Sequence, residues 1–171
     1  MSALPAALGG TKKSLFAWRL DRAKWAKSWR DGEGAYQAGG RWNPIGFRAV
    51  YTSLDPATAT LEVAVHKGFD VLDTQHHVLT RFALKRPKSV RVFQAEDLPN
   101  IDWLDPNFQS AAQKDWGAEM LEEHEVIAVP SAVSRESWNL VLKAPVARAD
   151  VTHIDHADYL LDPRLAAARR A

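Results

Sequence analysis

One carboxylate stands out among the residues that could do chemistry. Between Pro56 and Val65 the sequence PATATLEVAV carries a single charged residue, Glu62, among small and apolar neighbours. An isolated buried carboxylate is costly, so this side chain must be paired, hydrogen-bonded or exposed in a cleft. A carboxylate fixed beside a core can stabilise positive charge that develops on a substrate. A local salt bridge or simple exposure to solvent is the alternative interpretation of Glu62.

Two arginines and a tyrosine have types and neighbours that suit an anionic ligand with a flat ring. Arg41 follows Gly39-Gly40, and its guanidinium could hold phosphate or carboxylate where the glycines allow close approach. Arg19 lies inside the apolar run LFAWRL and needs either an acidic partner or a phosphate. Tyr51 ends an apolar run and could stack on the ring. Stacking of Arg41 on tryptophan, and core packing of Tyr51 with its hydroxyl bonded, are the alternatives.

Several familiar catalytic and binding motifs are absent. Ser131 follows the apolar run VIAVP and could present a hydroxyl, but no G-x-S-x-G surrounds it, so a serine hydrolase is not supported. With no cysteine there is no thiol nucleophile, and six scattered histidines without H-E-x-x-H predict no metal site. The glycine-rich stretch 31–40 is predicted to be a loop; it has Gln37 where the dinucleotide fingerprint needs glycine, and no phosphate-binding P-loop occurs.

The elements that must position these residues alternate between strands and a few helices. Asp55-Pro56 is typical of a helix start and Gly68 of a helix end, so the segment that carries Glu62 is predicted helical. Because this helix is apolar nearly all round, we expect its face with Ala57, Leu61, Ala64 and Val65 to be buried, with Glu62 at the margin. Further helices are predicted over 21–30 and 107–124, and strands over 15–20, 47–52, 78–84, 90–93, 126–129, 140–142 and 151–154.

Length and composition favour one compact domain. The 171 residues are 46% hydrophobic and 25% charged, and the grouping of strands favours a mixed α+β fold: a compact mixed sheet with flanking helices. We expect residues 1–14 to form a flexible tail and residues 15–171 a single domain. No apolar run is long enough to span a bilayer and no secretory signal is recognisable, so we expect a cytoplasmic protein without membrane contact.

The charge of the chain is unevenly distributed. Residues 1–51 hold nine Lys and Arg against three Asp and Glu, whereas the remainder is net acidic. A basic first third could meet a phosphorylated small molecule, a nucleic acid or an acidic partner, or it could be a solvated face. Four of the seven tryptophans fall in this third and predict that it belongs to the core. They are Trp18, Trp25, Trp29 and Trp42.

A set of short motifs in a fixed order carries a family resemblance. An aromatic-Arg strand (Trp18-Arg19) is followed by GGRW (39–42), a Tyr-ending strand (Val50-Tyr51), LEVAVH (61–66), VPSA (129–132) and WNL (138–140). In order and content these motifs, spread over about residues 15–165, resemble the RES-domain family, toxins of a bacterial toxin–antitoxin class. The tail and the tryptophan-rich stretch 21–30 depart from the family pattern.

The resemblance implies an ADP-ribosyltransferase-like fold and an enzyme that breaks the nicotinamide–ribose bond of NAD with water or phosphate as acceptor. NAD is then a consumed substrate, and neither a cofactor nor a metal is expected. Arg41, Tyr51 and Glu62 would be catalytic, and a second group would bind substrate: Arg19, Ser131 and Asn139. An Xre-type helix-turn-helix antitoxin is the implied partner and covers the active site. Transfer of ADP-ribose to a cellular protein is the alternative activity, and direct nucleic-acid binding is not expected.

Overall fold

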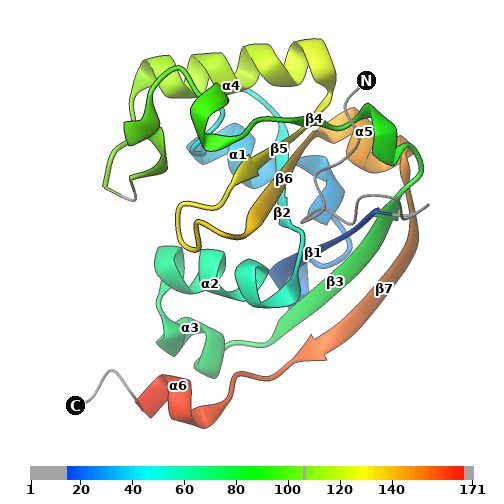
Figure 1. Ribbon diagram of the computed structural model, residues 1–171. Coiled ribbons are helices and arrows are strands. Elements are labelled where there is room, and N and C mark those ends of the chain that lie inside the picture. The colour runs from blue at the N-terminus through cyan, green and yellow to red at the C-terminus, as the bar shows by residue number, and fades with distance from the viewer. Residues whose placement is uncertain (1–14, 106, 168–171) are drawn as a thin grey trace.

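The computed structural model describes residues 15–105 and 107–167, and their strands form one strongly twisted sheet (Figure 1). The strand order is β4-β5-β6-β2-β1-β3-β7, with only the β4–β5 pair parallel. The strands are β1 (Leu15–Arg22), β2 (Ala49–Ser53), β3 (His77–Leu84), β4 (Arg91–Val92), β5 (Val126–Pro130), β6 (Trp138–Lys143) and β7 (Val151–Tyr159). The predicted tail, 1–14, lies outside the described residues.

The helices flank this sheet and are mostly short. The α-helices are α1 (Glu33–Ala38), α2 (Pro56–Lys67), α3 (Phe69–Thr74), α4 (Ala111–His124), α5 (Ala144–Ala149) and α6 (Pro163–Ala167). Single turns of 3-10 helix are η2 (Ala23–Trp25), η3 (Trp29–Asp31), η4 (Pro87–Ser89), η5 (Ala95–Asp97) and η6 (Ile101–Leu104). The mixed sheet with flanking helices is the predicted α+β class. Every helix within the described ranges is too short or too polar to span a bilayer.

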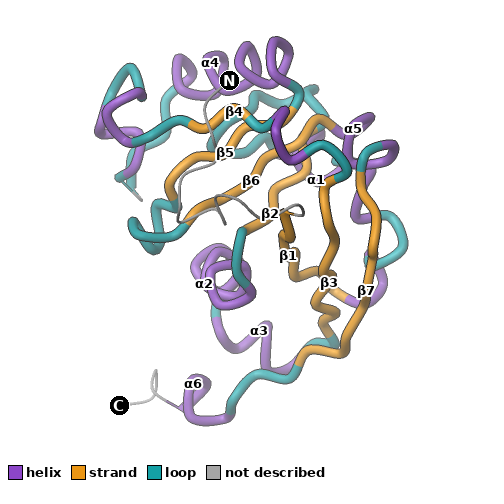
Figure 2. Tube along the Cα trace, turned by 45° about the vertical axis from the view of Figure 1, so that its right-hand side comes forward, coloured by secondary structure: helices purple, strands orange, loops and turns teal. Residues whose placement is uncertain are grey.

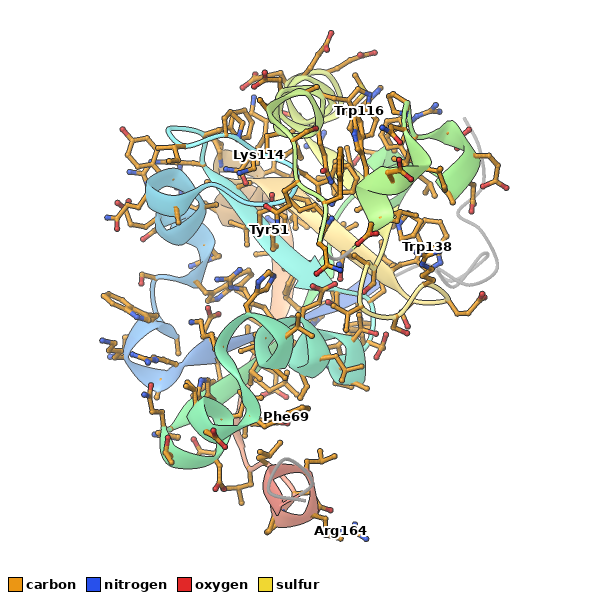
Figure 3. All side chains as sticks on the ribbon, turned by 90° about the vertical axis from the view of Figure 1, so that its left-hand side faces the viewer. Tyr51, Phe69, Lys114, Trp116, Trp138 and Arg164 are labelled. Carbon is orange, nitrogen blue, oxygen red and sulfur yellow. The ribbon has the colours of Figure 1, made fainter. Side chains whose placement is uncertain are left out.

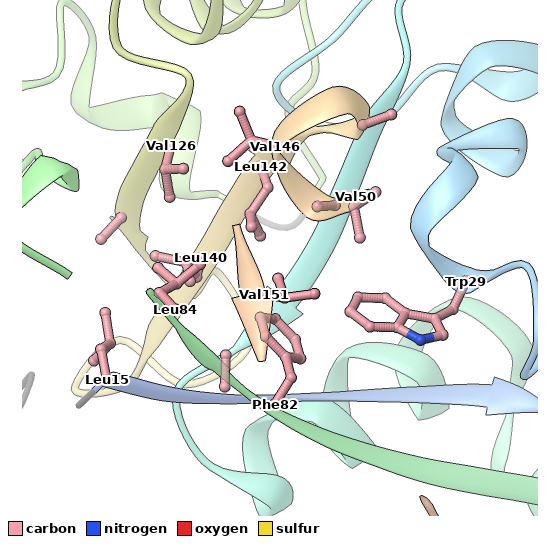
Figure 4. Close-up of a cluster of buried hydrophobic side chains, with 14 residues drawn as sticks. Leu15, Trp29, Val50, Phe82, Leu84, Val126, Leu140, Leu142, Val146 and Val151 are labelled. Carbon is pink, nitrogen blue, oxygen red and sulfur yellow. The ribbon is translucent and has the colours of Figure 1, made fainter. Parts of the chain in front are cut away.

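Two layers of side chains leave the sheet on opposite faces. On one face Val50, Phe82 and Leu140 pack into a core cluster that α5 and Trp29 close (Figure 4). On the other face α4 covers the β5–β6–β2 half, where Leu121 packs with Ile127 and other strand residues. The same face of the β1–β3 half is covered by α2 and α3 through a smaller cluster. The helices α4 and α2 therefore lie on the same face of the sheet with β2 between them, an arrangement that can be followed in Figure 2.

The ends of α2 are as predicted, but its buried face is not. Asp55 caps the first turn by accepting from the Thr58 amide at 2.7 Å, and Gly68 ends the helix at φ +84°. The small residues Thr58, Ala59 and Ala64 are buried, whereas Leu61 and Val65 are 38% and 59% exposed. The predicted buried face of Ala57, Leu61, Ala64 and Val65 is therefore wrong except at Ala64, because the helix lays its small residues against the sheet.

Most other differences from the predicted elements lie in the N-terminal third of the chain. The predicted helix over 21–30 is wrong, because β1 continues to Arg22 along β3 and two separate 3-10 turns follow. Trp29 is buried there but Trp25 is 55% exposed, so only part of the tryptophan prediction is correct. The stretch 31–40 contains the helix α1 rather than loop alone, and the predicted helix over 107–124 begins at Ala111.

Candidate functional site

The carboxylate of Glu62 is held by two side chains that are far away in the sequence. The Ser131 hydroxyl donates to Glu62 Oε1 at 2.8 Å, and the Asn139 amide donates to the same oxygen at 2.5 Å. Glu62 itself is half-buried, at the edge between the exposed face of α2 and the sheet. Its two donors come from the β5–β6 region, so the carboxylate reaches from α2 to the other half of the sheet. The structure thus brings together three of the predicted site residues.

All hydrogen-bonding positions of the Ser131 hydroxyl are occupied in this arrangement. Its hydroxyl donates to Glu62 and accepts from the backbone amides of Val133 and Ser134, at 3.2 and 3.1 Å. A hydroxyl has one donor and two acceptor positions, and here all three are occupied in a fully buried side chain. Ser131 therefore orients Glu62 and folds the loop after β5, and it has no hydrogen-bonding position left for a ligand.

A residue that the sequence interpretation missed supports Asn139 from behind. The Ser53 hydroxyl donates to Asn139 Oδ1 at 2.8 Å, which leaves the amide nitrogen to face Glu62. Ser53 and Asn139 are direct partners in the β2–β6 register, so their side chains leave the sheet on the same face. Nothing in the local sequence around Ser53 indicates this role, since it depends on the pairing of two strands 86 residues apart.

Tyr51 lies two residues before Ser53 on the same face of β2, between α4 and α2 (Figure 3). Its hydroxyl donates to Asn43 Oδ1 at 2.6 Å and accepts from the Trp42 amide at 2.9 Å. Burial raises the pKa of the Tyr51 phenol far above its ordinary value, so it stays protonated. The hydroxyl thus shapes the turn next to Arg41, and the ring is the part of Tyr51 available for stacking.

Gly40 is required by this same turn. A Cβ at Gly40 would lie 2.5 Å from the Tyr51 hydroxyl and 2.7 Å from Asn43 Oδ1. The second glycine of the GGRW motif therefore gives the backbone room to close on Tyr51, which explains why a glycine precedes Arg41. Asn43 completes the turn by donating from its buried amide to the carbonyls of Ala35, Pro44 and Phe47.

Main-chain oxygens hold the side chain of Arg41. Its Nη1 donates to the carbonyls of Trp103, Asp105 and Phe108 at 2.9–3.1 Å, which anchors the segment after η6. Burial lowers the pKa of the Arg41 guanidinium, and the negative charge of Glu62 acts in the opposite direction. The carboxylate of Glu62 is therefore close enough to Arg41 for its charge to act on the guanidinium.

An aromatic cluster supports the Arg41 turn from the α4 side. Trp42 packs edge-on against Trp103 and Trp116, and Phe93 adds a further edge-on contact to Trp116. Gly117 allows α4 to approach this close, because a Cβ there would lie 2.3 Å from the Trp42 carbonyl oxygen. The sequence interpretation missed Gly117, and a glycine inside an otherwise regular helix was the available signal.

Arg19 is placed differently from the other predicted residues. Alternate residues of a strand point to the same face, so Arg19 points to the same face of the sheet as Leu15 and Ala17. This face is opposite to the one that carries the Tyr51 ring. The guanidinium donates to both carboxylate oxygens of Asp21 at 2.8 Å and to the Tyr51 carbonyl at 2.8 Å. Of the two partners expected for Arg19, the structure shows the acidic one, and the arginine ties β1 to β2 beneath the site.

The chemistry available at this site is electrostatic. No group of three or more His, Asp or Glu side chains suited to a metal ion occurs within residues 15–105 and 107–167. One oxygen of Glu62 accepts both hydrogen bonds, with the Arg41 charge and the Tyr51 ring nearby. Such an arrangement can bind an anion and an aromatic ring together and can stabilise positive charge between them.

Comparison with known proteins connects this geometry to a family. The RES domain family matches residues 16–162. The protein "Toxin Res" of Photorhabdus laumondii subsp. laumondii is 32% identical over 162 residues, which is 91% of this chain and 100% of that protein. The M. tuberculosis MbcT–MbcA toxin–antitoxin complex contains a chain that matches with a TM-score of 0.64 and 20% identity, over 86% of this chain and 85% of that one. This likeness confirms the predicted α+β fold.

Proposed function

Because the chain belongs to the RES domain family, we propose that it is the toxin of a toxin–antitoxin pair and that it cleaves the nicotinamide–ribose bond of NAD. NAD would be consumed as substrate, in the cytoplasm where it is abundant, without a resident cofactor or metal. The observation that carries this proposal is a carboxylate fixed by Ser131 and Asn139 whose negative charge acts on the Arg41 guanidinium.

The charges and the ring suit the parts of NAD. The diphosphate is anionic and complements Arg41, while the nicotinamide is a flat ring on which Tyr51 can stack. When the glycosidic bond breaks, its electron pair leaves with nicotinamide and the ribose carbon becomes oxocarbenium-like. The Glu62 carboxylate stabilises this positive charge. Nicotinamide departs as a neutral molecule, so the reaction needs no general acid beside the leaving group.

Water or phosphate would then attack the same ribose carbon. Water gives ADP-ribose and one released proton, whereas phosphate gives ADP-ribose with a phosphate on that carbon. Transfer to a side chain of another protein is the alternative activity, and it uses the same site with a different acceptor. The three outcomes differ only in what approaches the ribose carbon, so the products distinguish them.

Exposed apolar side chains beside the site support an antitoxin partner. Leu61 and Val65 are exposed on the helix that carries Glu62, and Phe108 is 38% exposed next to its Arg41-bound carbonyl. Apolar side chains that flank a functional site are typical of surfaces that a protein partner covers. We propose that an antitoxin of the Xre helix-turn-helix type covers this surface and blocks access to Glu62.

The decisive experiment incubates purified, antitoxin-free protein with NAD and separates the products by chromatography and mass spectrometry. We expect stoichiometric release of nicotinamide, with ADP-ribose or its phosphorylated form as the second product. An ADP-ribose adduct on a protein would instead support the transferase alternative. The control is the Glu62→Ala variant, which should release almost no nicotinamide. Circular dichroism is used to check that this variant folds. Intact NAD after prolonged incubation with the wild-type protein would contradict the proposal.

The partner is tested separately. Leu61→Glu with Val65→Glu should weaken inhibition by the co-expressed antitoxin without lowering the rate of NAD cleavage, because neither side chain contributes to holding Glu62. Unchanged inhibition of this double variant would place the antitoxin on another surface.

A further inference from the structure

The strand residue Ser53 is the starting point of a chain of hydrogen bonds that ends at Glu62. Its hydroxyl donates to Asn139 Oδ1 at 2.8 Å, and Asn139 Nδ2 donates to Glu62 Oε1. Ser53 is 2% exposed and lies beneath Asn139, so it is shielded from any ligand that contacts Glu62. A role for Ser53 in the reaction must therefore act through Asn139.

The amide of Asn139 has two ends of similar shape and opposite hydrogen-bonding character. If it were rotated by half a turn, Oδ1 would face the Glu62 carboxylate and two acceptors would oppose each other. The Ser53 hydroxyl could still turn and accept from the amide nitrogen in that orientation, but only by giving up its own donation. In the observed orientation each group donates to an acceptor, in one consistent direction from Ser53 to Glu62.

Ser131 completes the arrangement from the opposite side. Because its hydroxyl accepts from two backbone amides, its single proton has no direction left except toward Glu62 Oε1. Both donors to Glu62 therefore have fixed polarity, and both act on the same oxygen. The second oxygen, Oε2, accepts from neither of them and is the oxygen that a ribose or its developing charge would meet.

From this geometry we propose that Ser53 is a positioning residue that fixes the Asn139 amide and so presents Glu62 Oε2 to the substrate. The catalytic part of the proposal rests on the function proposed above, whereas the fixed amide does not. Asn139, for which the family resemblance implies substrate binding, acts in this proposal on the carboxylate rather than on NAD. Ser131 acts in the same way.

Spectroscopy tests the fixed amide without any reference to activity. In wild-type protein we expect one Asn139 side-chain amide proton to be shifted strongly downfield by the carboxylate, assigned by its loss in Asn139→Asp. Ser53→Ala should move this proton back toward the position of a free amide. A matched control is Thr52→Val, which removes a buried hydroxyl of the same strand that donates to the Leu140 carbonyl on the other face. An unchanged Asn139 signal in Ser53→Ala would overturn the proposal.

Kinetics test the connection to catalysis. We expect Ser53→Ala to lower kcat by about five- to tenfold, the size expected for one indirect hydrogen bond, with little change in KM. Ser53→Thr, which keeps the hydroxyl, should restore most of the rate, and Thr52→Val should retain it. In the Asn139→Ala background, Ser53→Ala should have no further effect, since its only route to Glu62 has been removed. Additive losses in the double variant would overturn the proposal.

The experiments distinguish an error in the proposed function from an error in the positioning role of Ser53. If the wild-type protein leaves NAD intact while the Asn139 proton responds to Ser53→Ala as expected, the proposed function is wrong and the fixed amide stands. If nicotinamide is released but Ser53→Ala changes neither the signal nor kcat, the function stands and the positioning role of Ser53 is wrong.

Discussion

The two charged sides of the site are built in different ways. On one side Glu62 is held by Ser131, directly after β5, and by Asn139 of β6, whose register partner Ser53 in β2 supports it. On the other side Arg41 is held by carbonyls of an irregular segment, which a tyrosine-bonded turn and an aromatic cluster support. Strand pairs are rigid and loops adapt more easily. The difference suggests that the carboxylate side provides the chemistry and the guanidinium side provides binding.

The largest expected effect comes from removing the charge on the carboxylate side. In Glu62→Gln the amide oxygen can accept from Ser131 and Asn139 as Oε1 does, so the variant should fold and keep its geometry. We expect kcat for nicotinamide release to fall by about 10²–10³, as for other electrostatic contacts to a developing charge, with little change in KM. Retention of more than a tenth of the wild-type kcat would mean that the charge of Glu62 does not drive the reaction.

Next in size is a test of how the aromatic support of the Arg41 side is packed. Gly117→Ala places a methyl group 2.3 Å from the Trp42 carbonyl oxygen, so α4 or the Arg41 turn must move. We expect a loss of about 1–3 kcal/mol in the free energy of unfolding, measured by chemical denaturation. Gly34→Ala is the control, because a Cβ there meets open space on α1 and should be neutral or stabilising. Equal stability of both variants would show that α4 is not in close contact with the turn.

The same contrast explains which parts of the site could be predicted from the sequence. Glu62 was recognisable because it is the only charge between Pro56 and Val65 in a helix with clear ends, and Arg41 because two glycines precede it. Both signals are local. Ser53 and Asn43 could not be recognised, because their roles depend on the β2–β6 register and on the hydrogen bond from the Tyr51 hydroxyl. Gly117 was signalled by its place inside a regular helix, but its role depends on the approach of α4 to Trp42.

The errors in the predicted fold have the same origin. Trp25 and Trp29 have helical spacing, but pairing of β1 with β3 through Arg22 extends the strand into that segment. The exposed face of α2 was misjudged because helical periodicity states which residues share a face, and only packing decides which face is covered. Periodicity and capping thus predicted the α+β class, while long-range contacts determined the remaining details.

A smaller effect should separate binding from chemistry more sharply. Tyr51→Phe keeps the ring but removes the hydroxyl that binds the Trp42 amide and the buried Asn43 oxygen. We expect the free energy of unfolding to fall by about 1–2 kcal/mol and KM for NAD to rise, because the turn next to Arg41 loses its support. The kcat should stay within about twofold, since the hydrogen bonds of Glu62 are untouched. A fall in kcat equal to that of Glu62→Gln would erase the proposed division between the two sides.

The smallest effect concerns the far end of the helix that carries Glu62. His77 is buried at the start of β3, and its Nδ1–H donates to the Gln75 carbonyl at 2.6 Å. Burial lowers the pKa of His77 from its ordinary value and outweighs the hydrogen bond to the Gln75 carbonyl, which raises it. The positive charges of Lys67, in the last turn of α2, and Arg22 also lower this pKa, while Asp21 raises it. Folded protein therefore binds the proton less readily than unfolded protein.

Stability should accordingly be constant above a pH of about 6.5 and decrease as the pH falls below it, where the unfolded chain gains a proton that the folded chain resists. Thermal unfolding from pH 7.5 to 5.5 measures this change, and the comparison of His77→Gln with His76→Gln isolates it, because His76 is the exposed neighbour that pairs with Asp158. His77→Gln should reduce the loss of thermal stability between pH 7.5 and 5.5, and His76→Gln should leave it unchanged. If the two variants respond alike, the pH dependence of stability does not arise from His77.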